Sequence, residues 1–163
     1  MRNEMCLEFE AIAVNESLAR VAIAAFVAPL NPTLEELSDI KTAVSEAVTN
    51  AIIHGYENWQ GYDVEKRSVP VKFPIHPGRV TMKCRLEEGY LFVEIGDKGK
   101  GIRDIEKAME PLYTTRPEQN RSGMGFAFME AFTDDLEVES TPGEGTTVYM
   151  KKKMDSGNWI KEA

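Results

Sequence analysis

Three polar side chains recur at helical spacing in the stretch Ser45–Gly55, which reads SEAVTNAIIHG. Glu46, Asn50 and His54 are each four residues apart, so on a helix they share one face, one turn after another. Apolar residues between them form an adjoining stripe that can pack on a sheet. A carboxylate, an amide and an imidazole in one row can bind water, a hard cation or phosphate. The alternative interpretation is an ordinary helix face exposed to solvent.

Three glycine-rich segments follow along the chain. Gly96–Ile102 (GDKGKGI) comes after a strand-like run, and its glycines allow a sharp turn in which Asp97 can accept from an amino group. Arg121–Phe126 (RSGMGF) leads into a helix, where backbone N–H groups can bind phosphate and Arg121 can pair with a terminal phosphate. Gly143–Thr147 (GEGTT) opens a strand. Taken singly, each segment is equally typical of an ordinary surface turn or loop.

Composition narrows the class of protein. The 163 residues fit one domain, and an apolar fraction of 42% is enough for a core. A net charge of −8 argues against binding to nucleic acid or to an anionic membrane. Cys6 and Cys84 form no CxxC pair, and with two histidines no zinc site is expected, so both cysteines are predicted to be buried free thiols. Nowhere do 18 apolar residues run together, and we expect a soluble, cytoplasmic protein.

Apolar periodicity predicts helices interleaved with strands. Strands are expected at 5–14, 80–86, 90–95, 136–140 and 146–151, with a hairpin turn at 87–89. Helices are expected at 15–28, 33–54, 103–110 and 125–133. Asn15 is the predicted N-cap of the first helix, and Thr33 with Glu36 forms a capping-box signature at the second.

These elements predict an α+β fold, in which helices cover one face of a mixed, mostly antiparallel sheet in a two-layer α/β sandwich. The domain is expected to span residues 1–153, and residues 154–163 to form a polar tail. Two irregular segments interrupt the pattern, at 57–78 and at 111–121.

The four motifs, taken together and in this order, resemble those of the Bergerat-fold (GHKL) ATP-binding family, which includes gyrase B, Hsp90, histidine kinases and mismatch-repair ATPases. Within that family the chain is most similar to the small anti-sigma serine kinases, and among these to the sporulation members. The runs that carry this resemblance are NESLAR (15–20), SEAVTNAIIHGY (45–56), PLYTTRP (111–117) and RSGMGF (121–126).

The resemblance implies ATP or ADP and Mg²⁺ as cofactors, and a role for each matched residue. Glu46 would be the base that takes or orients the proton of the attacking hydroxyl, and Asn50 would hold Mg²⁺. Asp97, supported by Thr146, would recognise the adenine amino group. Arg121 would contact the γ-phosphate as a second catalytic residue. The other positions expected around the nucleotide are His54, Gly99, Gly101, Ile102, Thr114, Thr115, Ser122, Gly123, Met124, Gly125 and Phe126, with 111–121 as the ATP lid.

The resemblance also implies an anti-sigma factor that is a protein serine/threonine kinase. Such a protein binds a sporulation (sigma-F-like) sigma factor when ATP is bound, which blocks transcription. It also phosphorylates a serine of an anti-anti-sigma antagonist. Arg20 matches a position that docks these partners, and the family forms homodimers. Two alternatives stay open, namely a serine kinase of another regulon such as general stress, and a non-catalytic, nucleotide-gated sigma-binding module.

The sequence departs from the family pattern in two places. Lys98 stands where the family usually has Glu, and the segment 57–78 is longer than the family norm. We expect Lys98 to point away from the base, so that ATP binding persists. A surface insertion adds little closure entropy, but it can change partner contacts or oligomerisation.

Overall fold

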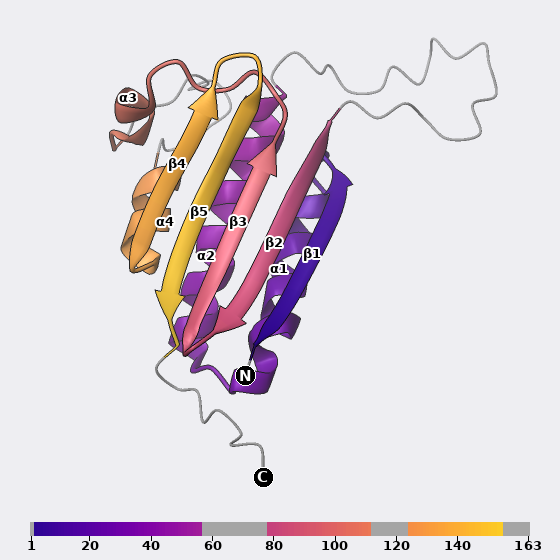
Figure 1. The fold of residues 1–163 in the computed structure, drawn as a ribbon, viewed down its shortest axis with the longest axis vertical. Coiled ribbons are helices and arrows are strands. Elements are labelled where there is room, and N and C mark those ends of the chain that lie inside the picture. The colour runs from indigo at the N-terminus through magenta and orange to yellow at the C-terminus, as the bar shows by residue number, and fades with distance from the viewer. Residues whose placement is uncertain (1, 57–77, 112–123, 155–163) are drawn as a thin grey trace, which may run out of the picture.

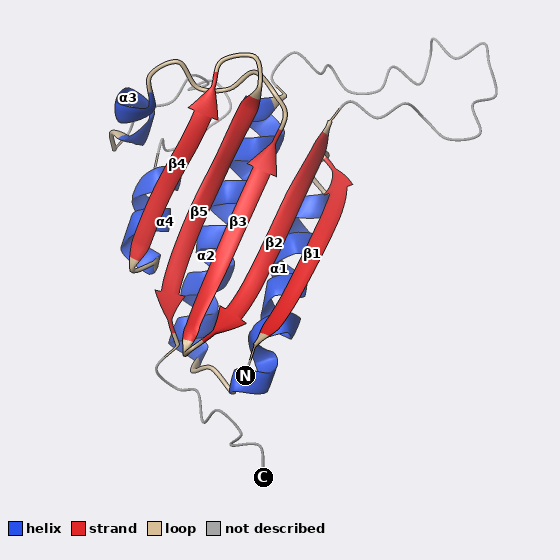
Figure 2. Cartoon of the chain, in the orientation of Figure 1, coloured by secondary structure: helices blue, strands red, loops and turns tan. Residues whose placement is uncertain are grey.

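The computed structural model describes residues 2–56, 78–111 and 124–154. In this part of the chain five strands form one antiparallel sheet in the order β1-β2-β3-β5-β4. The longer helices lie together on one face of that sheet (Figure 1, Figure 2). The predicted two-layer α+β sandwich is therefore confirmed, and every strand pair that the structure describes is antiparallel. The strands are β1 (Asn3–Glu10), β2 (Arg79–Glu87), β3 (Tyr90–Asp97), β4 (Asp135–Thr141) and β5 (Gly145–Lys153).

Six helical segments accompany the sheet in the described part of the chain. They are α1 (Asn15–Val27), the 3-10 turn η1 (Ala28–Leu30), α2 (Leu34–Asn50), the π-helical turn η2 (Ala51–Gly55), α3 (Ile105–Met109) and α4 (Gly125–Phe132). The predicted capping box opens α2, because the Glu36 N–H donates to Thr33 Oγ1 at 3.1 Å and the Thr33 N–H donates to Glu36 Oε2 at 2.7 Å. The predicted hairpin joins β2 to β3 through Glu88 and Gly89, both of which have positive φ.

The predicted first strand and its boundary with the first helix were wrong in two details. The strand ends at Glu10 rather than continuing to residue 14, because the chain turns there to place α1 on the sheet. Asn15 is not an N-cap. It is the first residue of α1, and its Nδ2 donates to the Glu10 carbonyl at 2.9 Å, which joins the strand end to the helix.

The core lies between the helices and the sheet. The inner faces of α1 and α2 contribute Ile23, Val27, Val44 and Val48, which pack against inward-facing residues of β2 and β3 such as Met82 and Ile95. Each of these six side chains is at most 1% exposed, and their burial is the main source of stability. Met154, one residue beyond β5, is also buried.

The outer face of the sheet carries no described helix (Figure 1). Strand alternation places Cys6 on that outer side with Glu4 and Glu8, so Cys6 is exposed and the prediction of two buried thiols was wrong for it. Cys84 is buried, as expected, and burial raises its pKa to about 12. None of the described helices is long and apolar enough to cross a membrane.

Candidate functional site

The C-terminal end of α2 carries two of the predicted site residues, Glu46 and Asn50, one turn apart. The helix then widens into the π-helical turn Ala51–Gly55, in which hydrogen bonds reach one residue further than in an α-helix. His54 lies in this wider turn, so its position is set by π-helical and not by α-helical geometry. Sequence periodicity missed this turn, and π-helical turns occur frequently at functional sites.

Asp97, the last residue of β3, is the only buried charged residue in the described part of the chain, with 9% of it exposed. Its Oδ1 accepts from the Gly99 N–H at 2.9 Å, and the backbone N–H of Thr146 also donates to the carboxylate. Burial raises the pKa of Asp97 to about 6, and these two hydrogen bonds act in the opposite direction. The carboxylate faces Gly55, where an added Cβ would lie 2.8 Å from Cγ of Asp97.

The turn after β3 packs directly against η2, because two glycines meet there. A Cβ on Gly99 would lie 1.8 Å from the Gly55 carbonyl oxygen, which also accepts from the Lys100 N–H at 2.7 Å. Gly101 has φ of +70°, and a Cβ there would meet the Thr141 carbonyl oxygen at 2.2 Å. The predicted glycines Gly99 and Gly101 are therefore required by close backbone contact, whatever ligand the site holds.

Two residues that sequence reasoning did not select hold this turn in place. The hydroxyl of Tyr56 accepts from the Lys98 N–H at 3.0 Å and donates to the Arg79 carbonyl at 2.7 Å. Ser140 Oγ accepts from the Ile102 N–H at 2.7 Å and lies 2.8 Å from Thr146 Oγ1. Only the pairing of β4 with β5, which sets Ser140 opposite Thr146, could have indicated the second residue.

The N-terminal end of α4 reaches the polar face of α2. A Cβ on Gly125 would lie 3.1 Å from Glu46 Oε2 and 3.3 Å from Asn50 Nδ2, so the fold brings these three predicted residues together. Met124 precedes the helix directly, and Phe126 packs its side chain partly against the core. The remaining predicted residues of this end, Thr114, Thr115, Arg121, Ser122 and Gly123, lie outside the described residues, as does most of the 111–121 lid.

Arg20 and Glu46, predicted for different roles, line one groove between α1 and α2. Its volume is about 500 Å³, and its other lining residues are Leu34, Leu37, Ser38, Lys41, Thr42 and Ser45. Arg20 Nε pairs with Glu16 Oε1 at 3.0 Å, and the same carboxylate accepts from Ser45 Oγ. Arg20 is thus linked through Glu16 to Ser45, which directly precedes Glu46.

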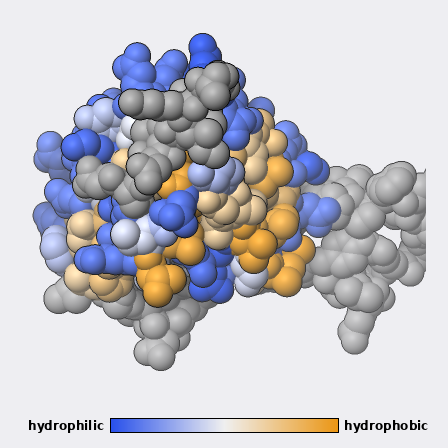
Figure 3. All heavy atoms as spheres, turned by 90° about the horizontal axis from the view of Figure 1, so that it is seen from below, coloured by the Kyte–Doolittle hydropathy of each residue, from blue (hydrophilic) through white to orange (hydrophobic). Residues whose placement is uncertain are grey.

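Apolar side chains reach the surface on the same helices. Leu18 and Val21 on α1 are 48% and 68% exposed, and Leu34 at the start of α2 is 87% exposed. Figure 3 shows apolar residues at the surface among polar ones at the lower end of the molecule. Exposed apolar residues beside a charged groove are typical of a protein-binding surface.

Comparison with known proteins identifies the family. The model of the histidine kinase-like ATPase domain matches residues 9–152. An anti-sigma F factor of Thermoanaerobacter sp. (strain X514) is 52% identical over 94% of this chain and 96% of its own length. Those of Geobacillus kaustophilus (strain HTA426) and Bacillus licheniformis are 52% and 48% identical, over 93% and 94% of both chains. The chain belongs to the anti-sigma F factor family of histidine kinase-like ATPases.

Solved structures agree on the fold of this family member. The RsbU and RsbW domains of a Mycobacterium tuberculosis protein match with a TM-score of 0.62 at 18% identity, over 93% of this chain and 32% of theirs. The SiaB–SiaC complex of Pseudomonas aeruginosa matches with a TM-score of 0.59 at 15% identity, over 90% of this chain and 88% of that one.

Membership of an ATPase family implies nucleotide binding, and the described residues fit an adenine nucleotide. Asp97 is a buried acceptor with N–H donors beside it, and the glycine contacts leave backbone rather than side chains around it. Asn50 offers an amide oxygen of the kind that Mg²⁺ accepts. The described residues include no group of three His, Cys, Asp or Glu that could hold a metal alone. A magnesium ion here would therefore take its remaining ligands from phosphate oxygens and water.

Proposed function

We propose that this anti-sigma F family member is an ATP-dependent protein serine kinase and anti-sigma factor. With ATP and Mg²⁺ bound, it holds a sporulation (sigma-F-like) sigma factor and so blocks transcription. It also transfers the γ-phosphoryl group to a serine of its anti-anti-sigma antagonist. The observation that carries the proposal is the position of Glu46, which lies beside Asn50 and Gly125 and also lines the groove that contains Arg20.

Asp97 binds the adenine end of the nucleotide. Its carboxylate accepts from the exocyclic amino group, and the neighbouring N–H groups of Gly99 and Thr146 hold it in place. Thr146 supports the base through its hydroxyl, which Ser140 orients. Because a site of this kind rejects bases that lack the donor, we expect ATP to be preferred over GTP.

Residues of α2 and α4 bind the phosphate end of the nucleotide. Asn50 would hold Mg²⁺, which would neutralise charge on the phosphates during transfer. The backbone N–H groups at the start of α4, beside Gly125, donate to phosphate oxygens at the positive end of the helix. Arg121 is proposed to contact the γ-phosphate.

Glu46 acts on the acceptor. It takes or orients the proton of the serine hydroxyl, whose oxygen forms the new bond to the γ-phosphorus while the bond to the bridging oxygen of ADP breaks. The groove that joins Glu46 to Arg20 gives a partner docked on α1 access to this carboxylate. The exposed Leu18 and Val21 extend that docking surface.

The test is transfer of labelled γ-phosphate from Mg-ATP to the antagonist protein, with ATP binding measured separately. Glu46→Gln should bind ATP with unchanged affinity and transfer no phosphate. Glu35→Gln is the matched control, because Glu35 is exposed on the first turn of the same helix. Wild-type protein that binds ATP and the sigma factor but transfers nothing would overturn the kinase and leave a nucleotide-gated sigma-binding module.

Sigma binding is tested on Arg20. Arg20→Ala should retain ATP binding and lose ATP-dependent capture of the sigma factor, and equal capture by the variant would contradict the proposed docking surface. A panel of sporulation and general-stress sigma factors decides the regulon. The homodimer stays a prediction, which sedimentation of the free protein checks.

A further inference from the structure

The short helix α4 is held against α2 at both of its ends. Its first residue, Gly125, lies beside Glu46 and Asn50. Its last residue, Phe132, lies seven positions further on, where its carbonyl has no partner within the helix. The placement of the phosphate end of the site thus depends on what fixes the far end of this helix.

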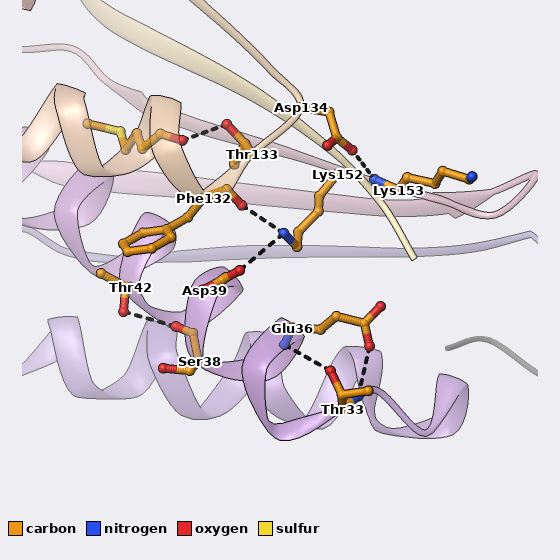
Figure 4. A network of polar contacts seen from close by, with 11 residues as sticks. Thr33, Glu36, Ser38, Asp39, Thr42, Phe132, Thr133, Asp134, Lys152 and Lys153 are labelled. Atoms are coloured by element: carbon orange, nitrogen blue, oxygen red, sulfur yellow. Dashed lines mark hydrogen bonds and ion pairs between the residues drawn. The ribbon is translucent and has the colours of Figure 1, made fainter. Parts of the chain in front are cut away.

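Lys152 on β5 fixes that far end. Its Nζ donates to the Phe132 carbonyl at 3.0 Å and pairs with Asp39 Oδ2 of α2 at 3.4 Å (Figure 4). The side chains of Lys152 and Asp39 are 15% and 26% exposed, so water screens this pair less than it screens a surface ion pair. A cation at a helix C-terminus also interacts favourably with the helix dipole.

The Lys152 contact at the end of α4 can affect the position of Gly125 at its start. Asp39 precedes Glu46 by seven residues on α2, and Phe132 follows Gly125 by seven residues on α4. At a rise of about 1.5 Å per residue, both intervals span roughly 10 Å, so the two helices run antiparallel with matched contacts at each end. Without the Lys152 contact, the C-terminal end of α4 loses this link to α2, and a tilt of the helix would move its first turn away from Glu46 and Asn50.

Neighbouring contacts reinforce the same end. Thr133 Oγ1 donates to the Met129 carbonyl at 2.6 Å, and Asp134 Oδ2 accepts from the Lys153 N–H at 2.5 Å (Figure 4). Of these three contacts, only that of Lys152 extends to α2. Lys152 also lines a small, mostly apolar cavity together with Val44 and Met150.

We propose that Lys152 is a positioning residue for the phosphate end of the nucleotide site. It anchors the C-terminus of α4 to α2 and thereby holds the helix start where Glu46 and Asn50 require it. This inference rests on the proposed ATP-dependent function. The inference predicts weaker binding of ATP but not of AMP, because the adenine end is built from β3, β5 and η2 without α4. General destabilisation would weaken the binding of both.

The experiment compares the binding of Mg-ATP and AMP to three variants of the full chain. Lys152→Met keeps the apolar stem and removes the charge, and it should weaken ATP binding about tenfold, the size expected for one charged hydrogen bond, with AMP affinity unchanged. Lys152→Arg should restore ATP binding. Lys83→Met is the control, because it removes an ion pair with Glu94 on the outer face of the sheet.

Hydrogen exchange provides a second measurement, in which the amides of α4 should exchange faster in Lys152→Met and at the wild-type rate in Lys83→Met. Wild-type ATP affinity in Lys152→Met would overturn the inference, as would an equal loss of ATP and AMP binding. These results would leave the proposed function intact. Wild-type protein that binds no ATP would instead overturn the proposed function together with this inference.

Discussion

The buried carboxylate of Asp97 makes a direct prediction about the dependence of stability on pH. Burial raises its pKa from an ordinary 3.8 to about 6 in the folded protein. Below pH 3.8 the group is protonated in both the folded and the unfolded chain. Between these two values the folded protein binds the additional proton, so the stabilisation that protonation provides is lost as the pH rises through 6.

The size of the effect follows from the two pKa values. At about 1.4 kcal/mol for each pH unit, the interval from 3.8 to about 6 corresponds to about 3 kcal/mol of unfolding free energy. Asp97→Asn removes this ionisation. It also exchanges one acceptor oxygen for a donor near the N–H groups of Gly99 and Thr146, which lowers stability by an amount that does not depend on pH.

The assay is urea unfolding of wild type and Asp97→Asn between pH 4 and pH 7.5. The stability of the variant relative to wild type should increase by about 2.5 kcal/mol across this range, whatever its value at pH 4, because part of the full change has already occurred at pH 4. Met82→Ala is the control, since it lowers stability without removing an ionisable group, and its difference from wild type should not change with pH. A constant difference between wild type and Asp97→Asn would refute the reasoning.

Three further substitutions distinguish effects on ATP binding from effects on the stability of the fold. Gly99→Ala places a Cβ 1.8 Å from the Gly55 carbonyl and should lower stability by more than about 1 kcal/mol and weaken ATP binding; unchanged ATP affinity would contradict the close packing. Thr33→Ala removes the capping box of α2 and should cost about 1 kcal/mol in urea unfolding, with ATP affinity unchanged. Met82→Ala empties a fully buried position and should lower the unfolding free energy by about 2–5 kcal/mol; a smaller loss would indicate that the core collapses around the cavity.

Local signals in the sequence were sufficient for most of the fold. The capping box of Thr33 and Glu36 is set by residues three apart, and the turn at Glu88 and Gly89 by two neighbours, so both were predictable. The predicted strand over 5–14 was too long, because nothing local between residues 11 and 14 opposes an extended chain. Where β1 ends depends instead on the packing of α1 against the sheet.

The residue types of the candidate site were predictable, but their pairings were not. Asp97 was chosen for its place at a strand end, yet its burial results from Gly55, which lies more than forty residues earlier. Ser140 and Lys152 act only through strand register and helix packing, and neither lies in a recognisable motif. The cluster of Glu46, Asn50 and Gly125 needs the α2–α4 contact, which no local pattern encodes.

Three departures from the usual rules of local stability occur close together in this fold. Asn50 is a weak helix former near the end of a long helix, the next five residues form a π-helical turn, and a carboxylate is buried beside that turn. Each lowers stability, and an apolar residue or a regular helix would fit the core better. Their contiguity distinguishes them from scattered defects, because one ligand can use all three. A nucleotide bound to the folded state offsets their combined destabilisation, since binding to that state alone raises the unfolding free energy.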